Sequence, residues 1–164
     1  MFADNGIRIQ QKNQITLALA DSKIVGTGKY NHMSMKTRIT SNRITELRPD
    51  EILVFGSNLE GAHGGGAAYL AWKKWGAIWG QGTGLQGQTY GIPTMHGGPG
   101  AIKPYVDEFI RFAKEHSQYT FLVTEIGCGI AGFAPKEIAP LFKEAANVPN
   151  IHLPQRFWDV LNAK

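Results

Sequence analysis

The sequence contains a single cysteine, Cys128, among its 164 residues. One cysteine cannot form an internal disulfide, and such a chain suits a reducing compartment. Charged residues make up only 18% of the chain, below the roughly one quarter that is usual for soluble domains. No run of about 18 apolar residues is present, and the first residues lack the continuous apolar stretch of a signal peptide. We therefore expect a cytoplasmic protein that has no membrane partner.

Basic residues outnumber acidic ones, but they form no block. The formal net charge is +4 and the isoelectric point is near 9.2, which would suit an anionic partner. The lysines and arginines of the N-terminal third are scattered, whereas nucleic-acid binding requires a clustered basic face. We therefore expect no direct, sequence-specific nucleic-acid partner.

Glycine is the residue in excess, and its distribution is uneven. Seventeen of the 20 glycines lie between positions 56 and 132. Glycine loses more conformational freedom on folding than any other residue. Its concentration between well-patterned segments therefore suggests a backbone that approaches a ligand.

The pattern of apolar residues predicts one α/β domain over residues 37–164 and an N-terminal extension, residues 1–36, whose alternation could form a hairpin. Strands are expected at residues 37–45, 51–55, 88–94, 120–124 and 150–154. Helices are expected at residues 67–75 and 104–116, from Pro135 through Ala145, and as a last turn at 157–161.

Two glycine-rich loops each follow a buried strand and lead into a helix. The first covers residues 64–66, and the second covers residues 127–132. Open α/β sheets bind ligands at this position, and the free N–H groups of a helix N-terminus suit phosphate. Two such loops could hold the two phosphates of a nucleotide diphosphate.

Two familiar phosphate motifs fit these loops less well. A Walker loop requires Lys and then Ser or Thr after its last glycine, but Gly66 is followed by two alanines. The spacing of Gly127, Gly129 and Gly132 matches a dinucleotide fingerprint, yet the acidic residue expected about twenty positions later is absent. A nucleotide site of another kind is favoured.

Several short segments, in order, resemble the macro-domain family. They are NRITEL (42–47), DEILVFGSN (50–58), GGGAA (64–68), TYGIPT (89–94) and TEIGCGIAGF (124–133). The resemblance covers residues 37–152, and segments 63–76 and 126–130 look most like the terminal ADP-ribose glycohydrolase branch. It implies a three-layer α/β/α sandwich with a mixed central sheet and with ADP-ribose in a surface cleft, without a cofactor.

The resemblance also implies which residues bind the ligand. Asn58 would lie beside the distal ribose, residues 64–67 would border this ribose and the diphosphate, and residues 127–132 would wrap the diphosphate, with Phe133 packed on the distal ribose. The residues expected to bind ligand are Gly56, Ser57, Asn58, Gly64, Gly65, Gly66, Ala67, Ile126, Gly127, Cys128, Gly129, Ile130, Ala131, Gly132 and Phe133.

Some positions depart from the family pattern. Asn42 and Arg43 stand where many macro domains carry an aspartate that reads the adenine amino group. The catalytic aspartate of the glycohydrolase branch corresponds to Ala131, and its lysine aligns near Met95 or His96. The other hydrolase branch has an aspartate in the first glycine loop, and residues 64–68 contain none.

Candidates for catalysis are therefore Asn58, His63 and Glu125, with His96 as a further general base. Cys128 would need a base to act as a nucleophile, whereas as a small packed residue it needs no partner. No short ligand spacing joins these histidines to Cys128, so no metal is expected.

Three functions remain open. The favoured one is a binder of ADP-ribose or a related nucleotide diphosphate, which could recognise ADP-ribosylated macromolecules. The alternative is a hydrolase that removes ADP-ribose from protein or nucleic acid, or degrades a related signalling nucleotide. An interaction module that binds no small molecule is disfavoured because so much glycine costs folding entropy.

Overall fold

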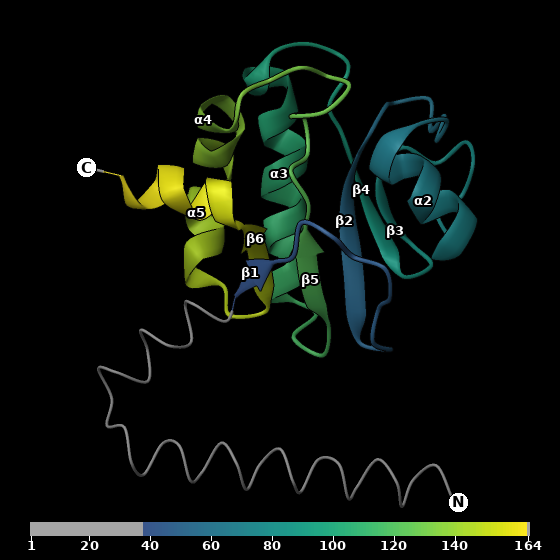
Figure 1. Cartoon of the computed structure of the whole chain (residues 1–164), viewed down its shortest axis with the longest axis horizontal. Helices are drawn as coiled ribbons and strands as arrows, with labels where there is room; N and C mark the ends of the chain where they lie inside the picture. The colour runs from purple at the N-terminus through teal and green to yellow at the C-terminus, as the bar shows by residue number, and fades with distance from the viewer. Residues whose placement is uncertain (1–37, 164) are drawn as a thin grey trace, which may run out of the picture. The chain divides into compact units, whose positions relative to one another are not determined.

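The computed structural model describes residues 38–163, and Arg38–Lys164 forms one compact unit. The hairpin expected within residues 1–36 lies outside the described residues. A six-stranded sheet with the order β1-β6-β5-β2-β4-β3 crosses the unit (Figure 1). Its strands are β1 (Ile39–Thr40), β2 (Glu51–Ser57), β3 (Gly84–Gln86), β4 (Thr89–Pro93), β5 (Thr120–Val123) and β6 (Ile151–Pro154). Every pairing is parallel except that of β3 with β4, so the sheet is mixed.

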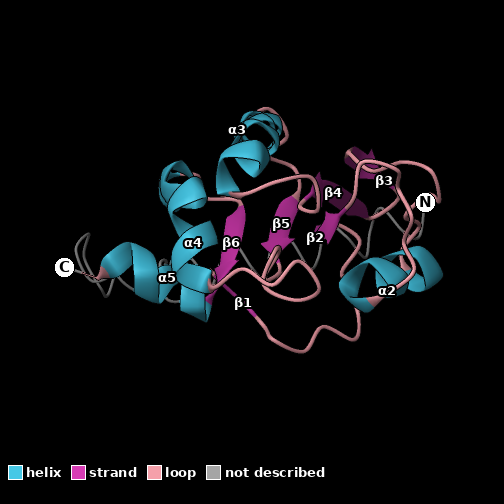
Figure 2. Cartoon of the chain, turned by 90° about the horizontal axis from the view of Figure 1, so that it is seen from above, coloured by secondary structure: helices cyan, strands magenta, loops and turns pink. Residues whose placement is uncertain are grey.

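Helices lie on both faces of this sheet, α2 on one face and α3, α4 and α5 on the other (Figure 2). Their bounds are α2 (Gly66–Lys74), α3 (Pro99–Lys114), α4 (Pro135–Ile138), the 3-10 helix η1 (Ala139–Asn147) and α5 (Gln155–Asn162). This α/β arrangement is compatible with a three-layer sandwich. Among the described residues, no helix is both long and apolar enough to cross a membrane.

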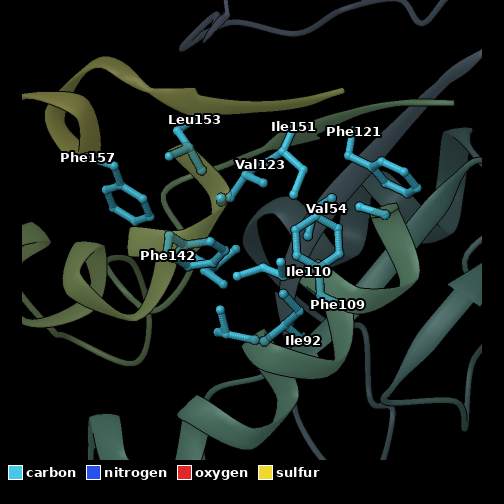
Figure 3. Packing of buried hydrophobic residues seen from close by; sticks show 14 of the residues in the cluster. Val54, Ile92, Phe109, Ile110, Phe121, Val123, Phe142, Ile151, Leu153 and Phe157 are labelled. Carbon is cyan, nitrogen blue, oxygen red and sulfur yellow. The ribbon is translucent and has the colours of Figure 1, made fainter. Parts of the chain in front are cut away.

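Strand β2 divides its side chains between two hydrophobic clusters. Leu53 and Phe55 pack with alanines of α2, whereas Ile52 and Val54 face the larger cluster on the opposite side. Successive side chains of a strand point to opposite faces, so a strand covered on both sides reads as a continuous apolar run. Figure 3 shows Val54 beside Phe109 of α3 in the larger cluster.

Arg38 connects the edge of the sheet at β1 to η1 and β6 through hydrogen bonds. Its side chain is buried, and its guanidinium donates five hydrogen bonds of 2.8–3.0 Å to backbone carbonyls. The acceptors are the carbonyls of Ala145, Ala146, Val148 and Ile151. Three of them lie at or just beyond the end of η1, where carbonyl dipoles favour a cation. Burial lowers the pKa of Arg38 below its usual value.

The expected strand at residues 37–45 is wrong in length, because only Ile39–Thr40 belong to the sheet. β1 pairs with β6 up to Thr40 opposite Pro154. Proline has no N–H to continue a ladder, and α5 begins at the next residue. The chain then leaves the sheet, and the Ser41 hydroxyl hydrogen-bonds the backbone of Arg43.

Two helices also differ from expectation. The helix expected at 104–116 begins at Pro99, with Gly98 as its N-cap, and Pro104 lies inside it. The helix expected from Pro135 through Ala145 is divided into α4 and η1. Pro140 follows the junction, and a proline within a helix removes one backbone hydrogen bond and crowds the preceding turn.

Candidate functional site

A cavity of about 400 Å³ opens where β2, β4 and β5 end at the same edge of the sheet. Both glycine loops line it, the first at the start of α2 and the second directly after β5. All of the residues expected to bind ligand line this cavity except Gly64, Gly132 and Phe133. The parallel sheet thus brings together two loops that are far apart in the sequence.

The first loop presents the N-terminus of α2 to the cavity. Gly65 is the N-cap, no side chain caps the helix, and no acidic residue occupies the first turn. The first N–H groups of a helix have no intrahelical partner and carry partial positive charge. Gly65, Gly66 and Ala67 all line the cavity, so the residues that carry these donors form part of its wall.

The second loop is a series of tight turns. Cys128 N–H donates to the Glu125 carbonyl at 3.1 Å, and Phe133 N–H donates to the Gly127 carbonyl at 2.8 Å. Gly127 has φ +75°, and a Cβ there would lie 3.1 Å from Ile138 Cδ1. The next N–H groups, those of Gly129, Ile130 and Ala131, have no acceptor among residues 38–163.

Ile130 joins the two loops at the mouth of the cavity. Its side chain is 75% exposed, yet Cδ1 lies 3.2 Å from the position that a Cβ on Gly65 would occupy. Met95, which also lines the cavity, is half-exposed. The mouth is therefore apolar, while the backbone inside it is polar.

Asn58 lines the cavity, but its side-chain amide is engaged by the loop that follows. Oδ1 accepts a 2.8 Å hydrogen bond from Ala62 N–H, and Nδ2 donates to the Ala62 carbonyl at 3.0 Å. This double contact closes the turn before the first glycine loop. Asn58 therefore shapes the loop in this structure, and this uses one N–H and one acceptor position of its side-chain amide.

His63 lies behind the first loop and does not line the cavity. Its ring is fully buried, and Nε2 lies 2.9 Å from the Ile78 carbonyl. Phe55 and Trp79 contact the ring edge-on, at centroid distances of 5.3 and 6.2 Å. The position expected for a general base is thus occupied by a packing residue that is inaccessible to a ligand.

His96 is likewise engaged away from the cavity. Its Nε2 lies 3.0 Å from the Ala101 carbonyl at the start of α3, and its ring meets Tyr105 edge-on at 5.3 Å. In the part of the chain that the structure describes, no group of three or more metal-ligating side chains is brought together. His63, His96 and Cys128 therefore form no cluster.

Glu125 does face the cavity, but it is paired with Arg156. The guanidinium donates from Nε to Oε2 and from Nη2 to Oε1, each at 2.9 Å. Arg156 is well exposed, whereas the carboxylate is half-buried. The pair fixes the carboxylate in place and occupies one acceptor position on each of its oxygens.

Cys128 carries a thiol that is held in its protonated form. Burial raises the pKa of Cys128, and the nearby Glu125 carboxylate raises it further. Phe133, which is expected to pack on a ribose, is partly buried against the larger hydrophobic cluster close to Gly127. It does not line the cavity in this structure.

A second cavity, of about 420 Å³, was not foreseen from the sequence. It lies between the segment that follows β1 and the start of α5, and its polar side chains are those of Thr40, Ser41, Asn42, Thr124, Glu125 and Arg156. Ala67, Thr124 and Glu125 line both cavities. The second cavity was missed because only the pairing of β1 with β6 brings these segments together.

Much of the glycine excess serves the fold and not the cavity. A Cβ on Gly82 would collide with the Asn58 carbonyl, and one on Gly61 would collide with the backbone of Gln81. A Cβ on Gly87 or Gly91 would likewise lie within 3 Å of backbone atoms. Close backbone packing therefore accounts for these four glycines, and the expectation that glycine marks a ligand is restricted to the two loops.

Comparisons with protein-family models, with curated proteins and with solved structures find no match to this chain. The two cavities and their lining residues are thus the basis for a functional argument.

Proposed function

We propose that this protein binds ADP-ribose or a related nucleotide diphosphate, with the diphosphate held between the two glycine loops of a macro-domain-like three-layer sandwich. One observation carries the proposal. Two loops that are distant in sequence line a single cavity, and each offers backbone N–H groups that have no acceptor among the described residues. Such groups bind anionic oxygen atoms, particularly at a helix N-terminus.

The side chains around the cavity support backbone recognition of the anion. The hydroxyls of Ser57, Thr94 and Thr124 donate to the carbonyls of Gly82, Ser57 and Val54, respectively. Glu125 is the only charged residue in the lining, and Arg156 offsets its charge. Backbone N–H groups are therefore the main donors left for phosphate oxygen atoms, beside the second N–H of the Asn58 amide.

The combined space also suits a dinucleotide-sized ligand. The two cavities measure about 400 and 420 Å³ and share a wall. Small-molecule sites usually measure roughly 300–1,000 Å³. A diphosphate in the first cavity would leave the second for a nucleoside.

Binding without turnover is the form of this function that the side chains favour. His63 is buried outside the cavity, Asn58 is engaged by Ala62, and Glu125 is paired with Arg156. A general base requires reach to the attacking water. We therefore propose a protein that recognises ADP-ribose, free or attached to a macromolecule, and place hydrolysis of the ADP-ribosyl bond second.

Calorimetric titration with ADP-ribose, AMP, ADP and NAD tests the proposal. We expect saturable 1:1 binding in which ADP-ribose binds more tightly than AMP, because AMP lacks the second phosphate. Absence of binding to all four would overturn the proposed function. Incubation with ADP-ribosylated protein and nucleic acid should release no ADP-ribose, and release would instead favour the hydrolase.

A further inference from the structure

We propose that Glu125 is a specificity-determining residue that accepts hydrogen bonds from the ribose hydroxyls of the bound nucleoside and so selects ribonucleotides over deoxyribonucleotides. This inference rests on the proposed function, because it presumes a diphosphate in the first cavity. It adds a role for the ridge between the two cavities, which is formed by Ala67, Thr124 and Glu125.

The ridge consists of the residues that line both cavities, which are Ala67, Thr124 and Glu125. In a nucleotide, the ribose joins the phosphates to the base. A ligand with its phosphates in the first cavity and its base in the second therefore places this ribose at the ridge. The group that contacts the sugar hydroxyls must come from one of these three residues or its backbone.

Glu125 is the only charged acceptor among the side chains of the ridge. Ala67 has no polar atom, and the Thr124 hydroxyl, which donates to the Val54 carbonyl at 2.8 Å, is a neutral and therefore weaker acceptor. Each oxygen of Glu125 accepts a single hydrogen bond, from Arg156. A carboxylate offers about four acceptor positions, so both oxygens retain capacity for a hydroxyl donor.

Arg156 makes this carboxylate a suitable partner for a diol. Its two-point contact fixes both oxygens in place. Hydrogen bonds from a hydroxyl to an ionised carboxylate are short and strong. A phosphate at the same place would meet a like charge, so the ridge favours the sugar and the loops favour the phosphates.

A second observation indicates that the adjoining cavity holds a polar group. Thr40 is 3% exposed, its hydroxyl has no hydrogen-bond partner within residues 38–163, and the residue lines the second cavity. Buried hydroxyls without partners are uncommon because they carry a desolvation cost. Together with Asn42, Thr40 offers the base neutral polar contacts on the far side of the ridge from the phosphates.

The test compares ADP-ribose with its analogues that lack the 2′- or the 3′-hydroxyl of the adenosine ribose, each titrated into the full chain. The wild-type protein should bind at least one analogue about tenfold more weakly, since hydrogen bonds to charged groups contribute roughly that factor or more. In Glu125→Ala, ADP-ribose should bind as weakly as that analogue, and the preference should disappear.

Two further variants separate recognition from structure. Glu144→Gln, an exposed carboxylate in η1 outside both cavity linings, should retain the wild-type preference. Arg156→Met should reduce the preference, because the carboxylate is no longer held. Circular dichroism and urea unfolding of each variant establish that the fold is intact.

Failure of the proposed role of Glu125 can be distinguished from failure of the proposed function. Equal binding of ADP-ribose and both analogues by the wild-type protein, or a preference that survives in Glu125→Ala, would overturn the role of Glu125 and leave the diphosphate site standing. Absence of ADP-ribose binding by the wild-type protein would overturn the proposed function, and this inference with it.

Discussion

The indole N–H of Trp158 donates a 2.8 Å hydrogen bond to the Arg38 carbonyl, and the Arg38 guanidinium lies 5.3 Å from the centre of the same indole ring. Backbone and side chain of Arg38 thus both contact one residue of α5. The guanidinium also binds the end of η1 and the start of β6. One arginine therefore connects the edge strand to three later segments.

Replacing Arg38 should destabilise the protein more than replacing an exposed arginine. Arg38→Met leaves several buried carbonyls without a donor, and we expect a loss of about 3 kcal/mol or more in the free energy of unfolding. Arg38→Lys keeps the charge but has fewer donors, so it should lose about half as much. Urea unfolding measures both, with the exposed Arg43→Met as control. Equal midpoints for Arg38→Met and Arg43→Met would contradict this role.

Acidification should weaken the fold through His152. Burial and then the positive charge of Arg38 lower the pKa of His152 below the usual value of about 6.5. At a pH between the pKa of His152 in the folded protein and its higher pKa in the unfolded chain, the unfolded chain binds more protons, so the free energy of unfolding increases with pH. The stability contributed by neutral His152 is complete above pH 6.5 and is lost as pH falls through the folded-state pKa. Urea unfolding from pH 7.5 to 5 should show a shallower pH dependence for His152→Gln, and identical slopes would refute the assignment.

Two glycines of the second loop should respond differently to substitution. Gly127→Ala should lower the free energy of unfolding by about 1–2 kcal/mol, because its backbone is left-handed. A side chain on Gly129 meets no atom within 4 Å, so Gly129→Val should change stability by less than about 0.5 kcal/mol. Gly129→Val should nevertheless weaken ADP-ribose binding at least tenfold, because the valine side chain narrows the cavity.

The control for these loop variants is Gly100→Ala in α3, where a Cβ also has open space. It should leave binding unchanged and stabilise the fold by about 0.5 kcal/mol. Wild-type affinity in Gly129→Val would argue against a ligand beside the second loop.

Cys128 should behave as an unreactive thiol. Because the thiolate is the reactive form, its raised pKa predicts alkylation by iodoacetamide at pH 8 that is slower in the native protein than in urea. Glu125→Gln should increase the native rate, since the carboxylate contributes to the shift. Cys128→Ser should bind ADP-ribose with unchanged affinity. Rapid alkylation of the native wild-type protein at pH 7 would show that the thiol is activated.

The interior strands and α2 could be predicted because each is a distinct apolar pattern bounded by glycine, proline or charge. β2, β4, β5 and β6 lie where the sequence predicts them. The edge strands β1 and β3 contain two and three residues, too few for any periodicity. The start of α3 was missed because Pro99 lies among glycines, which usually indicate a loop.

The candidate site was predictable to the extent that local sequence creates it. Strand, glycine loop and helix are contiguous, so the first cavity could be expected at the ends of β2 and β5. The pairing of Glu125 with Arg156 depends on the order of strands in the sheet. The burial of His63 depends in part on the edge-on contact of its ring with Trp79. No local pattern encodes either contact.

The position of the exposed Ile130 side chain close to Gly65 has a kinetic consequence. We expect this side chain to move aside when a ligand enters between the two loops and to return afterwards, so stopped-flow traces should show a concentration-independent second phase. Ile130→Ala should speed both association and dissociation while changing the equilibrium affinity only several-fold. An exposed isoleucine would then set the residence time of a ligand that it scarcely helps to hold.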